Sequence, residues 1–331
     1  MNALRFVAGR LAGVLLVLLV VAAATYAIFY LLPADPARLS CGKPCTPENL
    51  ARAQQFLGLD APWYGQLGQY LLGIVAGRTF GTGGAAIDCP APCFGYSFQL
   101  SSTVTDLILQ RLPVTASIAV GAAVLWFVSG VAGGTAAALN RGRLADRAIM
   151  TVAVAGVSAP AYLVGILGIL LFGFALGWLP TGGYVPLTED PVQWLLHLLL
   201  PWTALAFISA AVYARLTRAE LLEQLSLDHI RTARAIGLSE PAVVVRHGLR
   251  NALIPVVTVF GLDLGLLLGG AVITEKVFSM QGLGSLLITS ISSLDLQVVV
   301  GITLFSAFLV TVANLVVDLV YGVLDPRTVR R

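Results

Sequence analysis

Long uncharged runs of apolar residues alternate with short charged segments along the whole chain. The first run, residues 11–32, would as a helix extend about 33 Å, enough to cross a hydrocarbon core of about 30 Å. Further apolar runs cover residues 112–139, 148–188, 191–214, 251–274 and 296–317. We therefore predict an all-α integral membrane protein with six transmembrane helices.

Prolines modify the third run, which is long enough for one span and an outer loop. Pro160, Pro180 and Pro186 lie inside it. Because a proline removes a hydrogen-bond donor and breaks the helical ladder, we expect a kinked span that ends near Leu179.

The first run also admits the alternative of a cleaved signal peptide, since Arg5 and Arg10 precede it and small residues lie near its middle. The run stays apolar through Tyr30, which favours a retained helix.

Composition agrees with a membrane protein. Of the 331 residues, 57% are hydrophobic and 11% are charged, and the mean hydropathy is +0.87. The charged fraction is about half that of an ordinary soluble domain, which argues against a soluble enzyme. The net charge of +3 is too small to indicate a nucleic-acid partner.

The few basic residues are unevenly distributed. With a cytoplasmic N-terminus, 14 of the 20 Lys and Arg residues lie inside and 6 outside, as the positive-inside rule requires. We therefore predict that both termini are cytoplasmic. The chain then divides into a tail and first helix (residues 1–32), an extracytoplasmic segment (33–111) and a five-helix core (112–331).

All four cysteines lie in the extracytoplasmic segment, as the pairs Cys41/Cys45 and Cys89/Cys93. Outside the cytoplasm, paired thiols are expected to form disulfides. A zinc or iron–sulfur site is the alternative, although no other feature argues for metal. Of the three possible connectivities we favour pairing within each Cys-x-x-x-Cys group, because the neighbouring prolines favour tight turns.

The longest cytoplasmic segment, residues 215–250, is patterned for helices. Apolar residues recur at helical spacing up to Ile230. A short helix over residues 228–236 then meets Gly237, which can adopt the left-handed conformation that ends a helix, and Ser239 is a natural N-cap for the next helix. Small residues at this tip would let another protein approach the backbone closely: Ala233, Ala235 and Gly237.

Residues 231–240 (RTARAIGLSE) and 246–255 (RHGLRNALIP) closely resemble the EAA-type coupling loop of inner-membrane permeases in ABC importers, above all the dipeptide, oligopeptide and nickel group. Arg231 and Thr232 replace that family's first Glu and Ala, whereas Ala233 and Gly237 keep their places. Further matches cover nearly the whole chain: residues 140–147, 177–180, 275–284 and 324–327. The cysteine-bearing inserts depart from the pattern, as does Asp263, where the resemblance leads us to expect glutamine.

The resemblance implies a transport subunit of the cell (inner) membrane. It would form the translocation pathway with a second, similar permease, and work with two ATP-binding subunits and an extracytoplasmic solute-binding protein. The residues expected to couple it to the ATP-binding subunit are Arg231, Thr232, Ala233, Arg234, Ala235, Gly237 and Ser239. A solvated basic connector is the alternative interpretation of this loop.

ATP and magnesium would then bind to the partner subunits. We expect neither a catalytic residue nor a metal or cofactor site in this chain. Its only lysines, Lys43 and Lys276, lie outside any Gly-x-x-x-x-Gly-Lys-Ser/Thr loop, the pattern that would cradle a phosphate.

Asp263 is the one acid well inside an apolar run, where a charge costs about 2.5–3.5 kcal/mol at mid-bilayer. It either lines the translocation pathway and attracts the amino terminus of a peptide, or bonds to a neighbouring helix or subunit. The repeat of Gly261, Gly265 and Gly269 permits a close helix crossing, between subunits or within one. By resemblance, residues 277–286 form an outer lid.

The sequence therefore predicts the permease of an ATP-driven importer. Di- or oligopeptides are the favoured solutes, and nickel, oligosaccharides or haem-like ligands are compatible ones. An ion-gradient-driven transporter or channel is the alternative, and it would call for repeated intramembrane acids or inverted repeats, neither of which we detect. A membrane scaffold without transport is disfavoured by the organised loop.

Overall fold

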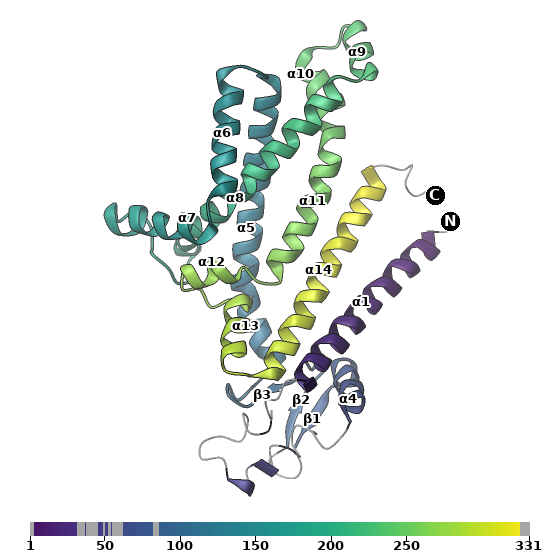
Figure 1. The fold of residues 1–331 in the computed structure, drawn as a ribbon, viewed down its shortest axis with the longest axis vertical. Helices are drawn as coiled ribbons and strands as arrows, with labels where there is room; N and C mark the ends of the chain where they lie inside the picture. The colour runs from purple at the N-terminus through teal and green to yellow at the C-terminus, as the bar shows by residue number, and fades with distance from the viewer. Residues whose placement is uncertain are drawn as a thin grey trace.

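The computed structural model describes residues 3–31, 37, 46–48, 50–51, 54, 62–81 and 86–324. Long helices run lengthwise through an elongated molecule (Figure 1). They are α1 (Ala3–Leu31), α5 (Val104–Leu139), α8 (Pro191–Leu225), α11 (Arg250–Leu268) and α14 (Leu296–Leu324). In Figure 1 the connection after α5 lies at the upper end and the connection before α14 at the lower end.

Small residues bring α5 and α8 together in the core. A Cβ at Gly121 would overlap the indole of Trp202, and one at Gly134 would lie 2.5 Å from the carbonyl oxygen of Ala214. Such close crossings increase the number of van der Waals contacts between the helices. These contacts hold helices together in a bilayer, where burial of apolar surface gives little driving force. Trp126 and other large side chains of α5, α8 and α11 are buried beside this crossing.

The third predicted run is broken rather than gently kinked. Helix α6 (Leu144–Ser158) ends before Pro160, and the chain bends there by 103°. Helix α7 (Ala161–Gly168) follows the bend and continues into the π-helix η2 (Ile169–Ala175). Pro160 lies at the break in an extended conformation, where its missing N–H and its ring oppose a continuous helix. Figure 1 shows α7 pointing away from the bundle.

By length and composition, four described helices can cross a membrane, or five if the bent pair is one span. The first predicted run corresponds to α1, a helix of 29 residues. Three helices do not start or stop where the uncharged runs do. Helix α5 begins at Val104 instead of residue 112, α8 continues to Leu225 instead of ending at 214, and α11 ends at Leu268 instead of 274.

Each boundary has a local cause. Thr103 caps α5 by accepting a hydrogen bond from the Asp106 N–H at 3.1 Å, and Asp106 is exposed, so a charge does not end this helix. After α11, Gly270 adopts a φ of +131°, which interrupts the helix before α12 (Val272–Val277). The charged residues after 214 lie on a continued α8.

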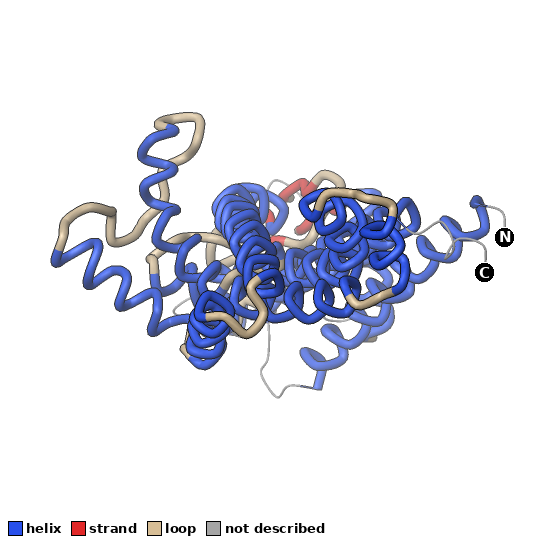
Figure 2. The backbone as a smooth tube through the Cα atoms, turned by 90° about the horizontal axis from the view of Figure 1, so that it is seen from above, coloured by secondary structure: helices blue, strands red, loops and turns tan. Residues whose placement is uncertain are grey.

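The lower end is not purely helical, so the all-α prediction was too narrow. Helix α4 (Trp63–Ala76) precedes the hairpin β1 (Arg78–Phe80) and β2 (Ile87–Cys89), and a second hairpin pairs β3 (Tyr96–Ser97) with β4 (Ser102–Thr103). Both hairpins are antiparallel. Figure 2 shows the strands, in red, confined to a small part of a helical molecule. Helix α13 (Leu283–Ser292) lies above these strands, and α12 lies higher still, just below α7 in Figure 1.

Candidate functional site

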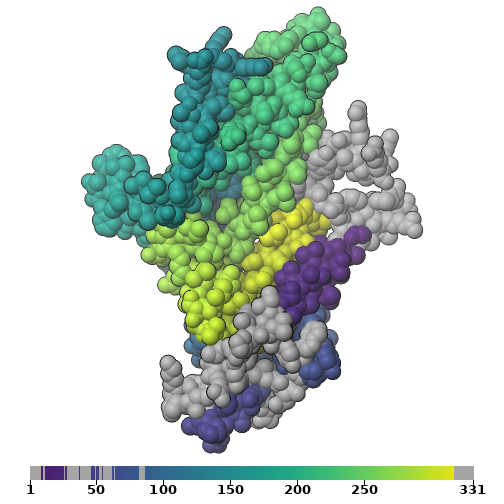
Figure 3. All heavy atoms as spheres, in the orientation of Figure 1, coloured from purple at the N-terminus to yellow at the C-terminus, as the bar shows by residue number. Residues whose placement is uncertain are grey.

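The predicted coupling segment forms a helical corner at the upper end of the molecule (Figures 1 and 3). Helix α9 (Asp228–Ala235) is followed by the single turn α10 (Glu240–Ala242) and the π-helix η3 (Val243–Leu249), which runs into α11. We call residues 228–249 the upper corner.

Gly237 ends α9 as predicted. Its φ is +84°, its N–H donates to the Arg234 carbonyl at 3.0 Å, and the Leu238 N–H donates to the Ala233 carbonyl at 3.3 Å. These two bonds make a Schellman motif, which satisfies carbonyl groups at the helix end. Ser239 occupies the predicted N-cap position of α10 in an extended conformation, and its side chain makes no capping hydrogen bond.

The interior of the corner is apolar. Ile230, Ala233 and Val243 are buried together, with Leu225 against them. Ala233 therefore fills the inside of the corner and is not part of an approachable tip, contrary to the expectation from its size alone. Alanine fits here because α9 and η3 pack closely.

The other predicted coupling residues are exposed: Arg231, Thr232, Arg234, Ala235, Gly237 and Ser239. Two apolar side chains that sequence reasoning missed join them, Ile236 at 72% exposure and Leu238 at 40%. The sequence did contain a signal for this exposure, because both apolar residues flank Gly237 in a charged segment. The small interior of the corner, which Ile230, Ala233 and Val243 fill, does not include them. Ile236 and Leu238 thus give this exposed, charged tip two apolar side chains that a partner protein could cover.

Two ion pairs form between residues of the upper corner. Arg234 and Glu240 form an ion pair with Nε and Oε1 2.8 Å apart, and Arg231 pairs with Asp228 at 3.2 Å. All four side chains are exposed, so these pairs contribute little to stability.

A partly buried ion pair ties the upper ends of α6 and α8 together. Arg218 donates from Nε and Nη2 to the two carboxylate oxygens of Asp146 at 2.7 and 2.8 Å, and the Gly142 N–H donates to the same carboxylate at 2.9 Å. Asp146 is 4% exposed. This bidentate geometry fixes the loop before α6 against the part of α8 that leads into the corner.

The structure gives Asp263 a neighbour on another helix. The Tyr213 hydroxyl of α8 donates to Asp263 Oδ2 at 2.8 Å. Four aromatic rings cluster around this pair: Trp126, Phe127, Tyr213 and Phe260. Tyr213 and Phe260 contact each other, and each of them contacts both Trp126 and Phe127, with ring centroids 4.7–6.4 Å apart. The hydrogen-bonded arrangement that the sequence left open is thus present.

The glycine repeat of α11 meets α14 within the same chain. A Cβ at Gly265 would lie 2.9 Å from that of Ala313, and one at Gly269 would lie 3.2 Å from that of Ser306. Gly261 is buried as well. At least two of these glycines therefore serve packing inside one subunit.

The segment predicted as a lid is built around Glu275, which is fully buried. Its Oε1 accepts from the Thr115 hydroxyl at 2.8 Å and its Oε2 from the Ser285 N–H at 2.6 Å, while the Leu283 N–H donates to Thr115 at 2.8 Å. A side chain at Gly282 would overlap both partners. Glu275 of α12 and Thr115 of α5 therefore cap α13, whose own N-cap glycine has no side chain. We call these residues the Glu275 clasp.

A second clasp, with one buried and one exposed hydrogen bond, joins β3 and the residues after it to the residues before α14. Ser97 donates to the Asp295 carboxylate, and the Gln99 side chain donates to the Ser293 carbonyl at 2.7 Å. Burial raises the pKa of Asp295, opposed by the hydrogen bond from Ser97.

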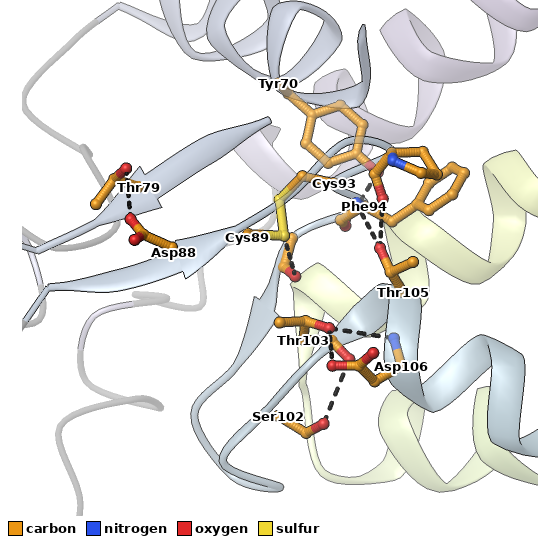
Figure 4. Close-up of a disulfide and its surroundings, with 12 residues drawn as sticks. Tyr70, Thr79, Asp88, Cys89, Cys93, Phe94, Ser102, Thr103, Thr105 and Asp106 are labelled. Carbon is orange, nitrogen blue, oxygen red and sulfur yellow. Dashed lines mark hydrogen bonds between the residues drawn. A yellow bond between two sulfur atoms is a disulfide. The ribbon is translucent and has the colours of Figure 1, made fainter. Parts of the chain in front are cut away.

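Cys89 and Cys93 form a disulfide, which agrees with local pairing (Figure 4). Both are buried with Phe80. The next residue, Phe94, accepts from the Tyr70 hydroxyl at 3.3 Å through its carbonyl and packs against Phe305 of α14. Cys41 and Cys45 lie outside the described residues. Within the parts of the chain that the structure describes, no three His, Cys, Asp or Glu residues are grouped to hold a metal ion.

Comparison with known proteins identifies the family of this chain. Residues 130–330 match the family described as binding-protein-dependent transport system inner membrane component, and residues 3–119 match the N-terminal region of such membrane components. A Brucella abortus (strain 2308) protein named as a peptide transport system permease is 41% identical over 318 residues, 96% of each chain. The glutathione transport system permease protein GsiC of Escherichia coli (strain K12) is 40% identical over 324 residues, 98% of each chain. The chain therefore belongs to the family of inner-membrane permease components of binding-protein-dependent transport systems.

Proposed function

We propose that this chain is one of two permease subunits of an ATP-driven peptide importer. It crosses the inner membrane six times, with α1 as the first span and the bent pair α6–α7 as the third, and both termini are cytoplasmic. The upper end in Figure 1 is then the cytoplasmic end, and the disulfide-bearing lower end faces outward. The uneven distribution of basic residues supports this orientation.

The observation that carries the proposal is the exposed upper corner. It has an apolar interior of its own and presents Ile236, Leu238, Arg231 and the bare backbone of Gly237 to solvent at one end of the membrane helices. A Cβ at Gly237 would meet nothing within 4 Å, so another protein can approach this backbone directly. We assign the corner to contact with an ATP-binding subunit.

Coupling through this corner is mechanical. The corner continues without interruption into α11 and packs on α8, where Leu221 and Leu225 lie against Gly248. Movement of an ATP-binding subunit would therefore displace two helices of the bundle together. A second permease, two ATP-binding subunits and an extracytoplasmic solute-binding protein complete the importer, and ATP and magnesium bind to those partner subunits.

Peptides are the proposed solutes. Two relatives that match nearly the whole chain are named for transport of peptides and of glutathione, itself a peptide. In this arrangement the solute-binding protein selects the cargo, and this chain forms part of the pathway through the membrane.

The test compares Gly237→Val with Gly142→Val in the complete complex reconstituted in liposomes. Both glycines have positive φ (+84° and +78°), both have open space where the side chain would go, and both lie at the upper end. The two changes therefore impose about the same backbone strain, roughly 1–2 kcal/mol.

We expect Gly237→Val to abolish peptide uptake while the complex still assembles, because the isopropyl group occupies the surface that the ATP-binding subunit contacts. Gly142→Val should retain most uptake. Equal uptake by both variants and the wild type would refute the coupling role. Failure of the wild-type complex to accumulate any di- or oligopeptide would refute the peptide assignment.

A further inference from the structure

We infer that Asp263 forms a subsite for a primary ammonium group, the amino terminus of a peptide in transit. This inference rests on the proposed function and adds to it the chemical group that the membrane pathway recognises. It is carried by the carboxylate's hydrogen bonding, by the aromatic rings around it and by its depth in the bundle.

The Asp263 carboxylate is held on one side only. Tyr213 donates to Oδ2, whereas Oδ1 has no hydrogen-bond partner among the described residues. The side chain is half-buried, and its neighbours Leu262 and Leu266 on α11 are 45% and 64% exposed. Oδ1 therefore remains available to a ligand that approaches this face of α11.

A packing role alone does not account for the charge. To accept one hydrogen bond from Tyr213, a neutral amide would serve as well, without the cost of an ionised group inside an apolar run. An acid with one oxygen occupied and one free is the arrangement that suits a cation, because a charged acceptor strengthens its hydrogen bonds to an ammonium.

The surrounding rings favour the same ligand. Phe127 and Phe260 are half-buried with centroids 4.7 Å apart, and Phe260 lies one helical turn before Asp263. The faces of aromatic rings attract cations. Lys and Arg are absent from residues 251–274, so no side chain of this run of α11 competes for the carboxylate.

The depth of the site fits a pathway. Asp263 follows the first residue of α11 by 13 positions, and Tyr213 and Trp126 precede the last residues of α8 and α5 by 12 and 13. At 1.5 Å per residue, all three lie about 18–20 Å from the upper ends of their helices. Three helices thus bring polar and aromatic side chains to one level, well within the membrane.

Tyr213 acts as a positioning residue in this site. Its ring is buried and its hydroxyl holds the carboxylate through Oδ2, which leaves Oδ1 for a ligand. Tyr213→Phe keeps the ring and removes only this hydrogen bond, which makes it the matched partner of Asp263→Asn.

The experiment measures equilibrium binding of radiolabelled alanyl-alanine to the purified complex in nanodiscs without the solute-binding protein. Three unlabelled competitors separate the sources of charge: alanyl-alanine methyl ester, which keeps the amino-terminal ammonium, N-acetyl-alanyl-alanine, which has none, and N-acetyl-alanyl-lysine, which carries an ammonium only on a side chain. Uptake into liposomes with the binding protein is recorded in parallel, so that the peptide-importer proposal is judged separately.

We expect the methyl ester to displace the label and N-acetyl-alanyl-alanine to fail. Asp263→Asn should weaken binding about tenfold or more, and Tyr213→Phe about threefold, in line with one charge-assisted hydrogen bond and one supporting bond. Displacement by N-acetyl-alanyl-lysine as strong as by the ester would overturn the assignment to the amino terminus. Absence of wild-type binding up to millimolar peptide, or equal displacement by the ester and N-acetyl-alanyl-alanine, would overturn the subsite.

Discussion

The two ends of the molecule are held together in different ways. In the upper corner, the hydrogen bonds and ion pairs join residues three to six positions apart, such as Gly237 with Arg234 and Arg234 with Glu240. At the lower end, the buried bonds join distant segments: Thr115 to Glu275 spans 160 positions and Ser97 to Asp295 spans 198.

This difference matches the two tasks that we propose. A corner held by contacts among neighbouring residues can move as one unit with an ATP-binding subunit and pass that movement on to α8 and α11. The lower end instead locks α5, α12 and α13 to one another through buried groups. Residues 277–286, the segment that the resemblance predicts as a lid, are therefore anchored by this junction in the structure.

The largest expected effect is loss of the Glu275 clasp. Glu275→Leu would leave the Ser285 N–H and the Thr115 O–H without their acceptors, and unsatisfied buried donors cost about 1–3 kcal/mol each. We expect a clear fall in the thermal midpoint of the purified complex, followed by tryptophan fluorescence. Thr115→Ser, which keeps the hydroxyl, is the control and should stay close to wild type. An unchanged midpoint for Glu275→Leu would mean that the lower end is not braced by this residue.

A smaller effect should follow removal of the disulfide. In the chain-entropy model, a bridge that closes so short a loop contributes about 2 kcal/mol. The double variant Cys89→Ser/Cys93→Ser should raise hydrogen exchange in residues 62–103 and leave residues 228–249 unchanged, because no bond of the upper corner passes through this region. Faster exchange at both ends would show that the two ends are not independent.

The contrast between local and distant contacts also explains what the sequence could predict. Gly237 was predictable, since the helix pattern, the glycine and the following polar residues are adjacent in the chain and the Schellman motif needs nothing else. The positions of the long helices followed from uncharged runs, because a bilayer demands length and apolarity. The break at Pro160 was predictable in place but not in angle.

The Glu275 clasp and the Tyr213–Asp263 pair could not be predicted. A buried acid at position 275 sits in a polar, charged stretch of sequence, and only the approach of α5 shows that it is covered. The partner of Asp263 lies 50 positions away on α8, and no spacing within α11 indicates it. Ala233 shows the reverse error, because small size suggested an exposed contact where the fold uses it for interior packing.

The smallest expected effect concerns the exposed ion pair of the upper corner. Arg234 and Glu240 are both exposed, so a double-mutant cycle with Arg234→Ala and Glu240→Ala should give a coupling energy of about 0.2–1 kcal/mol in thermal unfolding. If Arg234 also contacts the ATP-binding subunit, as we propose, Arg234→Ala alone should lower uptake by more than Glu240→Ala does, although both break the same pair. Equal uptake by the two single variants would confine Arg234 to bracing the corner and leave Arg231, Ile236 and Leu238 to make the contact.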